Sequence, residues 1–343
     1  MIRRTLARFG IDAYLIALMA TVAVAAVLPA HGVGATVANG AVSVAVALLF
    51  FLYGARLSPL AVWEGLLHWR LQSLVFASTY VLFPLLGLVL ARTFGGWLPR
   101  ELVAGLIFLC ILPSTVQSSI AFTGIARGNV AAALCSASVS NLFGMVLTPL
   151  LVVLLLDSKG GGFSTQAIEN IALQLLLPFV AGQLLRRWIG PFLQRHKAPL
   201  SLVDRGSILL VVYAAFSEGM VAGIWSQVTL GDLALVSLLG LALLAAVLVT
   251  TTLASRRLGF SKEDEIAIVF CGSKKSMASG IPMANILFPG QALGLIVLPL
   301  MLFHQAQLVA CAVLAQRYAR RSEPEGTAAS IPAVASPSAA GAR

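Results

Sequence analysis

The sequence predicts an all-α polytopic membrane protein with ten transmembrane helices. Of its 343 residues, 59% are hydrophobic and only 10% are charged, whereas a soluble domain carries about 25% charged residues. The apolar residues gather in runs that mostly reach the roughly 20 residues needed to cross the hydrocarbon core of a bilayer. The net charge of +10 does not indicate a nucleic-acid partner, because no basic patch is interleaved with aromatic residues.

The predicted spans follow one another along most of the chain, separated by Gly, Pro or charged residues. In order they are residues 11–28, 36–55, 71–91, 102–126, 129–156, 165–185, 206–224, 230–253, 264–288 and 291–316. The first span has a longer apolar run than a signal peptide, so we expect it to be a transmembrane helix. Residues 322–343 are rich in Ala, Ser and Pro and have no apolar face, which predicts a disordered tail.

The basic residues predict the orientation of the spans. When the segments between spans alternate between two sides, one side receives only Arg92, Arg100 and Lys159, and nearly all other Lys and Arg fall on the opposite side. By the positive-inside rule, both termini are then cytoplasmic. We expect a multi-pass protein of the bacterial inner membrane.

The ten spans divide into five and five between 129–156 and 165–185, and the longest basic segment, 186–205, reads as a loop after the sixth span. Because five is odd, two homologous halves would have opposite orientations, as in the inverted repeats of many secondary transporters. We therefore predict a first five-helix repeat over 1–157 and a second over 158–321. This prediction rests on the number of spans and not on similarity between the halves.

The fourth span of each half is interrupted. Pro113 has no amide hydrogen and clashes with the preceding turn, so the first helix should open there. The polar residues that follow it are Ser114, Thr115, Gln117, Ser118 and Ser119. In the second half, Gly272, Gly280 and Pro282 flank a group of polar residues: Ser273, Lys274, Lys275, Ser276 and Ser279. Matched interruptions indicate a transport site; the alternative is a pair of proline kinks with serines bonded to their own helices.

Lys274 and Lys275 lie too far from either end of their span for their amines to reach the membrane surface. Placing both at the bilayer centre costs on the order of 5–7 kcal/mol, which a carboxylate, water or a bound anion must offset. Glu218 is the one carboxylate deep in another predicted span. Either a Glu218–lysine pair holds helices in register, or Glu218 neutralises one lysine and leaves the other to bind substrate.

Other polar residues are weaker candidates. Ser136 and Ser140, followed by Asn141, have near-helical spacing and could line the same cavity, although small residues at helix contacts explain them equally well. His304 is more typical of a hydrogen-bonded core histidine. The four cysteines are scattered singly without CxxC spacing and are typical of packing residues.

Two stretches resemble the bile acid:sodium symporter family. They are residues 113–129, with a Ser pair and the sequence ARGN, and residues 271–276, CGSKKS. The similarity is greatest to the branch that includes the seventh mammalian member of solute carrier family ten, and it covers nearly all of residues 10–320. It implies a panel domain (helices 1, 2, 6 and 7), a core domain (helices 3–5 and 8–10) and two broken helices that cross in the core.

The resemblance also implies an ion site, from which this chain departs. In transporting members the crossing holds two sodium ions, and Ser118 and Ser119 match the pair that binds the first. Phe270, however, stands where the family has a carboxylate shared by both ions, and Lys274 stands where it has a sodium-binding glutamine.

The hydroxyls of helix five depart in the same way. Ala133 and Ala137 stand at their positions, and Ser136 and Ser140 lie one helical step away.

A buried ammonium has the charge of a sodium ion and donates to the same oxygens, so Lys274 could replace sodium and reduce or abolish sodium coupling. Alternatively, it could exchange protons, because burial disfavours a charged amine.

These observations predict a secondary transporter that moves a small organic anion by alternating access. Lys274, Lys275 and the half-helix N-termini would attract the anion. With no GxxxxGK[ST] motif, energy would come from a gradient or a partner.

The alternative is a membrane regulator that binds a ligand without moving it. An enzyme is not expected, because the spans lack a metal-ligand cluster and a plausible Ser/His/Asp set. We expect no cofactor beyond sodium or a proton, membrane lipid as the surroundings, and a state compatible with a monomer.

Overall fold

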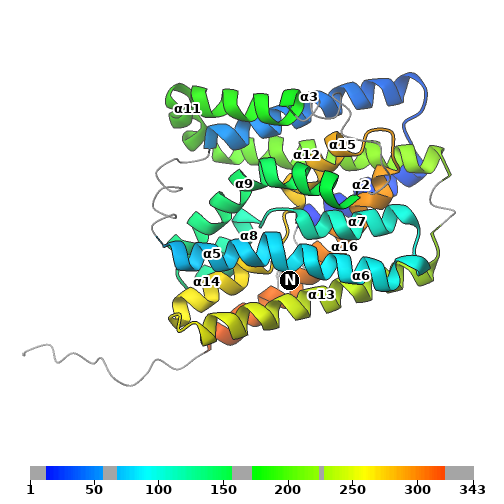
Figure 1. Ribbon diagram of the computed structural model, residues 1–343. Coiled ribbons are helices and arrows are strands. Elements are labelled where there is room, and N and C mark those ends of the chain that lie inside the picture. The colour runs from blue at the N-terminus through cyan, green and yellow to red at the C-terminus, as the bar shows by residue number, and fades with distance from the viewer. Residues whose placement is uncertain (1–12, 57–67, 157–171, 224–227, 321–343) are drawn as a thin grey trace, which may run out of the picture.

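The computed structural model describes residues 13–56, 68–156, 172–223 and 228–320. Within these ranges every regular element is a helix and no strand occurs. Most helices run side by side along one common direction (Figure 1). The predicted tail, 322–343, and the predicted boundary between the two repeats lie outside the described residues.

Among its described residues, the first half of the chain contains three continuous candidate spans, one of them with a π-helical turn, and one broken span. Its elements are α2 (Ala13–Val27), α3 (Val33–Arg56), α5 (Trp69–Ala77), η1 (Ser78–Leu82), α6 (Phe83–Phe94), η2 (Gly95–Trp97), α7 (Arg100–Ile111), α8 (Val116–Ile125) and α9 (Val130–Leu156). The π-helical turn η1 joins α5 directly to α6.

The second half has a similar sequence of elements. They are η3 (Ala172–Leu176), α11 (Leu177–Arg195), α12 (Lys197–Val221), α13 (Leu230–Arg257), α14 (Lys262–Gly272), α15 (Met277–Leu287) and α16 (Leu293–Ala319). A four-residue break separates α14 from α15, as a similar break separates α7 from α8.

The segment 186–205 is helical, so the predicted loop there is wrong. Helix α11 continues to Arg195, and α12 begins at Lys197. Pro199 falls in the first turn of α12, where its missing amide hydrogen removes no helical bond. Leu193 is buried in a cluster with Leu52 and Ala55 of α3. The extension of α11 is therefore stabilised by apolar contacts, which the basic composition of the segment does not indicate.

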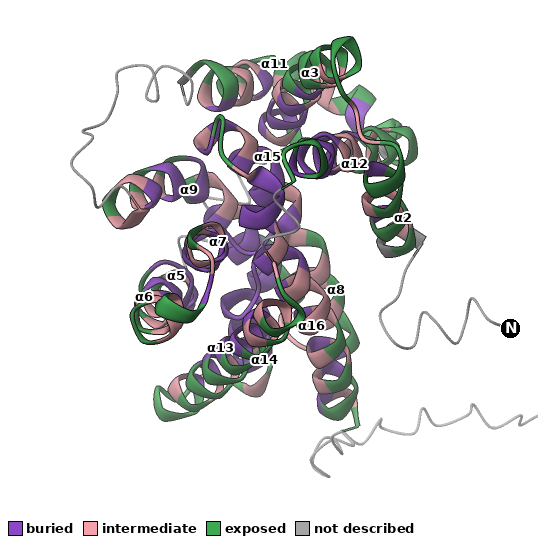
Figure 2. Ribbon diagram, turned by 90° about the vertical axis from the view of Figure 1, so that its right-hand side faces the viewer, coloured by how far each residue is buried: buried purple, intermediate pink, exposed green. Residues whose placement is uncertain are grey.

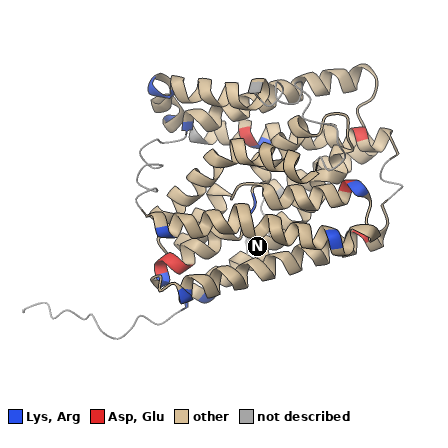
Figure 3. Ribbon diagram, in the orientation of Figure 1, with Lys and Arg blue, Asp and Glu red and all other residues tan. Residues whose placement is uncertain are grey.

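The described helices are those of a polytopic membrane protein. Six helical segments are long and apolar enough to cross a bilayer, and α7 and α8, bent by 59° at their break, make a seventh if they form one span. Large apolar side chains such as Leu85, Leu154 and Leu238 are exposed on the outside, where lipid would cover them. Lys, Arg, Asp and Glu lie mostly at the two ends of the helices (Figure 3). The total of ten spans and the inverted repeat stay predictions.

Four helices form a closely packed group at one side of the molecule. Helix α3 packs against α11 and α12, and α12 packs against α2 (Figure 2). Gly54 of α3 and Gly182 of α11 bring two backbones together: a Cβ on Gly54 would overlap the carbonyl of Phe179, and a Cβ on Gly182 would overlap that of Phe51. The two helices therefore approach as closely as small residues permit.

The buried centre of the molecule lies around the two broken spans (Figure 2). In α14, every residue from Glu265 to Gly272 is buried, and in α15 most residues are. Helix α12 contacts both α15 and α16, and the hydroxyl of Tyr53 on α3 donates to the carbonyl of Ala278 at 3.2 Å. The four-helix group therefore touches the broken span directly.

Candidate functional site: the meeting of two helix breaks

The two helix breaks lie directly against each other. The amide of Ser276 donates to the carbonyl of Pro113 at 2.9 Å, and the hydroxyl of Thr115 donates to the carbonyl of Lys275 at 3.1 Å. One break lies between Ile111 and Val116 and the other between Gly272 and Met277, as the prolines, glycines and polar residues predict. Residues about 160 positions apart in sequence therefore form one site.

Hydroxyl groups satisfy the carbonyls at the end of α14. A helix leaves its last four carbonyls without a partner in the helix. The last four carbonyls of α14 are those of Val269, Phe270, Cys271 and Gly272, and that of Val269 also accepts from the backbone amide of Ser273 at 3.2 Å. They accept hydrogen bonds from the hydroxyls of Ser273 (2.6 Å), Ser119 (3.1 Å), Ser114 (2.6 Å) and Ser78 (2.8 Å), respectively. Three of the predicted site residues therefore close a helix end.

Lys275 is fully buried and its amine is fully engaged. Its Nζ donates to the carbonyls of Thr79 (2.9 Å), Cys110 (2.7 Å) and Leu112 (2.8 Å). Its backbone amide and carbonyl both bond the side-chain amide of Gln307, at 2.9 and 3.0 Å. Carbonyl dipoles therefore offset the cost of burying this charge.

Lys274 is equally buried, but its Nζ has no hydrogen-bond partner. The amine lies 4.0 Å from the ring centroid of Phe122 and 5.4 Å from that of Phe270. Aromatic faces attract a cation electrostatically, and the thiols of Cys271 and Cys311 are also within electrostatic reach. All three donors of this amine remain unused.

Glu218 pairs with neither lysine, which corrects the sequence-based hypothesis. Its side chain is exposed, and no ion pair joins it to Lys274 or Lys275, both of which are among the described residues. Helix α12 ends at Val221, so Glu218 lies in its last turn and not at mid-depth. A carboxylate there can be solvated at the helix end.

Ser140, Asn141 and Ser276 join the network around the first break. The amide of Ser114 donates to the hydroxyl of Ser140 at 3.0 Å, and the side chain of Asn141 donates to the carbonyl of Ser114 at 2.7 Å. Ser276 caps α15 by accepting from the amide of Ser279 at 3.2 Å. Asn141 accepts from the hydroxyl of Ser279, which links α9 to α15.

The remaining predicted residues are placed differently. The hydroxyls of Ser118 and Ser136 are buried and have no hydrogen-bond partner, whereas Gln117 is exposed. Thr115 precedes α8 without a side-chain bond to its first amides. The start of α8 therefore presents free amide hydrogens beside an exposed glutamine, an arrangement that favours an anion.

Sequence reasoning missed several residues of this network. Three of these are polar residues inside apolar spans, and each bonds a backbone group near a break. Gln307 bonds the backbone of Lys275, Thr148 bonds that of Ile111, and Tyr80 bonds that of Ser140. Their polarity in an apolar run was the available signal, because buried polar groups need partners. His304 does make the expected hydrogen bond, to Gln307 at 2.8 Å.

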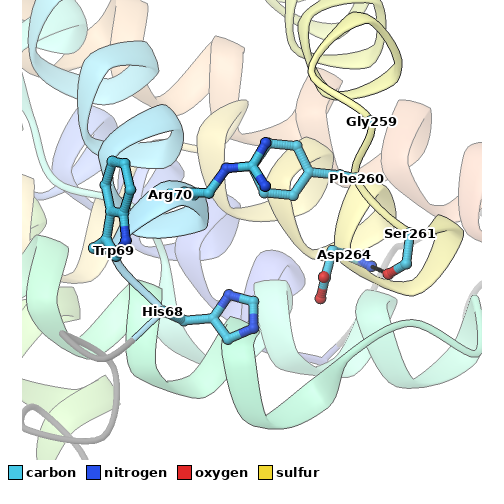
Figure 4. A pocket seen from close by; sticks show the side chains of 7 residues that line it. All are labelled: His68, Trp69, Arg70, Gly259, Phe260, Ser261 and Asp264. Atoms are coloured by element: carbon cyan, nitrogen blue, oxygen red, sulfur yellow. Dashed lines mark hydrogen bonds between the residues drawn. The ribbon is translucent and has the colours of Figure 1, made fainter.

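A cavity of about 250 Å³ lies elsewhere, at the start of α5 and the turn before α14. Its lining residues are His68, Trp69, Arg70, Gly259, Phe260, Ser261 and Asp264 (Figure 4). Arg70 stacks on Phe260, 5.3 Å from the ring centroid, and donates to the carbonyl of Leu258. No predicted site residue lines this cavity. The described residues also contain no cluster of three His, Cys, Asp or Glu side chains that could hold a metal ion.

Comparison with known proteins identifies the family. The model of the SBF-like CPA transporter family matches residues 12–320. The chain belongs to this family. Its kinship with bile acid:sodium symporters, expected from residues 113–129 and 271–276, is confirmed.

Several known proteins match this chain nearly end to end. The Pseudomonas aeruginosa protein PA2026, whose name assigns no activity, is 57% identical over 92% of this chain and 95% of its own length. The Escherichia coli protein YfeH, named as a candidate symporter, is 51% identical over 91% of this chain and 94% of its own. Rat sodium/bile acid cotransporter 7 is 29% identical over 91% of this chain and 93% of its own. These kinships support a transporter.

Proposed function

We propose that this protein is a secondary transporter that carries a small organic anion across the bacterial inner membrane by alternating access. The observation that carries the proposal is the contact between the two breaks, where two buried lysines lie beside the first turns of α8 and α15. Half-helix N-termini and ammonium groups both favour a negative charge. Family membership and the name of the E. coli relative support transport.

Lys274 is the residue that we assign to the anion. Lys275 has no donor to spare, whereas the amine of Lys274 has three. Because Lys274 is fully buried behind Phe122, the described arrangement is a closed form in this proposal. The anion reaches the amine when the broken spans move relative to the four-helix group of α2, α3, α11 and α12, which would form the panel of a ten-span inverted repeat.

Coupling to sodium is reduced in this proposal, and a proton is the alternative coupling ion. A sodium site at Ser118 and Ser119 would have one free hydroxyl and one that already donates to the carbonyl of Phe270. Phe270 itself supplies no carboxylate. In proteoliposomes, replacing sodium by choline should change uptake little, and a pH gradient should drive uptake only if Lys274 exchanges protons.

A ligand screen by thermal shift, followed by uptake into proteoliposomes, tests the proposal. Lys274→Met should weaken binding of the anion found at least about tenfold, because a charge-assisted hydrogen bond contributes about 1.5–3 kcal/mol. Arg92→Met, which removes an exposed positive charge away from the breaks, should leave binding unchanged. An unchanged affinity in Lys274→Met contradicts the assignment. Binding without uptake would favour the alternative, a membrane protein that senses a ligand.

A further inference from the structure

Lys275 occupies a cage of backbone oxygens that belongs to two separate spans. Thr79 lies in the π-helical turn η1, whereas Cys110 and Leu112 lie at the end of α7. The three carbonyl oxygens are 2.7–2.9 Å from Nζ. The ring of Phe83 lies on another side of the amine, with its centroid 4.2 Å away. The ammonium group is therefore enclosed by oxygen dipoles and one aromatic face.

Two prolines leave two of these oxygens, those of Thr79 and Cys110, without amide partners. In the π-helical register of η1, the amide of Phe83 bonds the carbonyl of Ser78, so the carbonyl of Thr79 would need the amide of residue 84. Residue 84 is proline and has none. At the first break, Pro113 stops α7, and the amide of Ser114 bonds Ser140 instead of the carbonyl of Cys110.

The cage is specific to one of the two lysines. The Nζ of Lys274 lies among aromatic rings and thiols and has no oxygen acceptor. Gln307 holds the backbone of Lys275 at both its amide and its carbonyl, which fixes the direction of its side chain. Unlike Lys274, Lys275 is therefore held at every polar atom.

We propose that Lys275 is a positioning residue whose ammonium group acts as an internal cation, and that the oxygens of Thr79, Cys110 and Leu112 form a latent site for a monovalent metal cation. The ammonium ties the break of α7 to η1. Rings of backbone carbonyls bind alkali cations in channels by replacing the hydration shell of the ion. Removal of the side chain exposes the same oxygens, and sodium or potassium then takes its place. This inference goes beyond the proposed function, because thermal unfolding in different salts tests it and no transported substrate is needed.

The test compares Lys275→Ala with two matched variants in the full-length purified protein. Lys275→Ala opens space inside the cage. Lys275→Met removes the charge but fills the space with a side chain of similar length. Lys274→Ala removes the neighbouring lysine, whose Nζ has no hydrogen-bond partner. Thermal unfolding is measured for each variant, and for the wild-type chain, in NaCl, KCl and choline chloride at equal ionic strength.

We expect the alkali cations to raise the unfolding temperature of Lys275→Ala by at least about 4 °C over choline, beyond any change in the wild type. Lys275→Met and Lys274→Ala should show no such gain. An equal unfolding temperature of Lys275→Ala in all three salts overturns the proposal, as does an equal gain in Lys274→Ala. If Lys275→Ala does not survive extraction in choline, the recovery of monodisperse protein in each salt replaces the melting curve, and equally poor recovery in all three overturns it.

Discussion

At the scale of single residues, two adjacent lysines meet the same cost of burial in different ways. Lys275 donates to three carbonyls, whereas Lys274 lies against the rings of Phe122 and Phe270 without a hydrogen bond. Three charge-assisted bonds stabilise a buried ammonium more than aromatic contacts alone. Lys275 is therefore a structural residue, and Lys274 is the one free to change its interactions.

Gln307→Leu should destabilise the protein by about 1–3 kcal/mol, because it leaves the buried amide of Lys275 without an acceptor. The measurement is thermal unfolding in detergent. Gln316→Leu, an exposed change on the same helix, should have little effect. Equal unfolding temperatures of the two variants would show that the Gln307–Lys275 bonds do not contribute to stability.

The sequence identifies the lysines as costly but does not identify their partners. The three acceptors of Lys275 are backbone carbonyls, and any residue type carries one. Glu218 was the obvious partner by composition, but the last turn of α12 places it at a helix end. Which carbonyls are free depends on how two distant breaks dock, and no local pattern encodes that docking.

At the scale of helices, the end of α14 depends on hydroxyls from other elements. Ser78, Ser114 and Ser119 come from η1, the first break and α8, and each bonds a different carbonyl. Serines in membrane helices often bond their own helix, as Ser237 bonds the carbonyl of Leu233. Ser78, Ser114 and Ser119 instead join separate helices.

Ser114→Ala should destabilise the protein by about 1–3 kcal/mol, since the buried carbonyl of Cys271 loses the hydroxyl that bonds it. Ser237→Ala removes the same atom within an intact helix, where the backbone already satisfies the carbonyl, and should change stability by less than about 0.5 kcal/mol. Chemical or thermal unfolding measures both. A larger effect for Ser237→Ala would refute this account of the helix end.

Gly54→Ala should destabilise the packing of α3 on α11 by about 1–3 kcal/mol, because the added methyl overlaps the backbone of Phe179. Gly40→Ala on the same helix meets no atom within 4 Å and should be neutral or stabilising by up to about 1 kcal/mol. Unfolding temperatures of the two variants check the prediction. A more damaging change at Gly40 would contradict it.

Helix positions were more predictable than helix ends. Pro113 and Gly272 mark both breaks because proline and glycine act on the local backbone. The continuation of α11 to Arg195 was missed, because a basic amphipathic end resembles a loop in composition. The helical structure of this end depends on the contact of Leu193 with α3, a tertiary contact that the local sequence does not reveal.

At the scale of the whole molecule, the charges predict its orientation in the membrane. The described Arg92 and Arg100 flank the turn between α6 and α7, and most other basic residues belong to the opposite side in the ten-span arrangement. The positive-inside rule then places the end of α16 in the cytoplasm. Family membership supports a multi-pass protein.

Cysteine labelling should measure that orientation. All four native cysteines are buried, so they should react slowly with an impermeant maleimide. Gly96→Cys, exposed at the turn after α6, should react in intact spheroplasts. Arg320→Cys, exposed after α16, should react only after permeabilisation. The reverse pattern would mean that the protein is inserted the other way round.

The contact between the breaks also imposes an order on biosynthesis. Ser78, Ser114 and Ser119, which bond carbonyls at the end of α14, leave the ribosome long before α14 does, so the second break enters a membrane where these donors are already present. The first break has no such advantage: the carbonyls of Cys110 and Leu112 wait until residue 275 has been inserted. The nascent chain thus carries an unfinished helix end through the synthesis of about half the protein, and this interval is when a chaperone or a quality-control protease would recognise it.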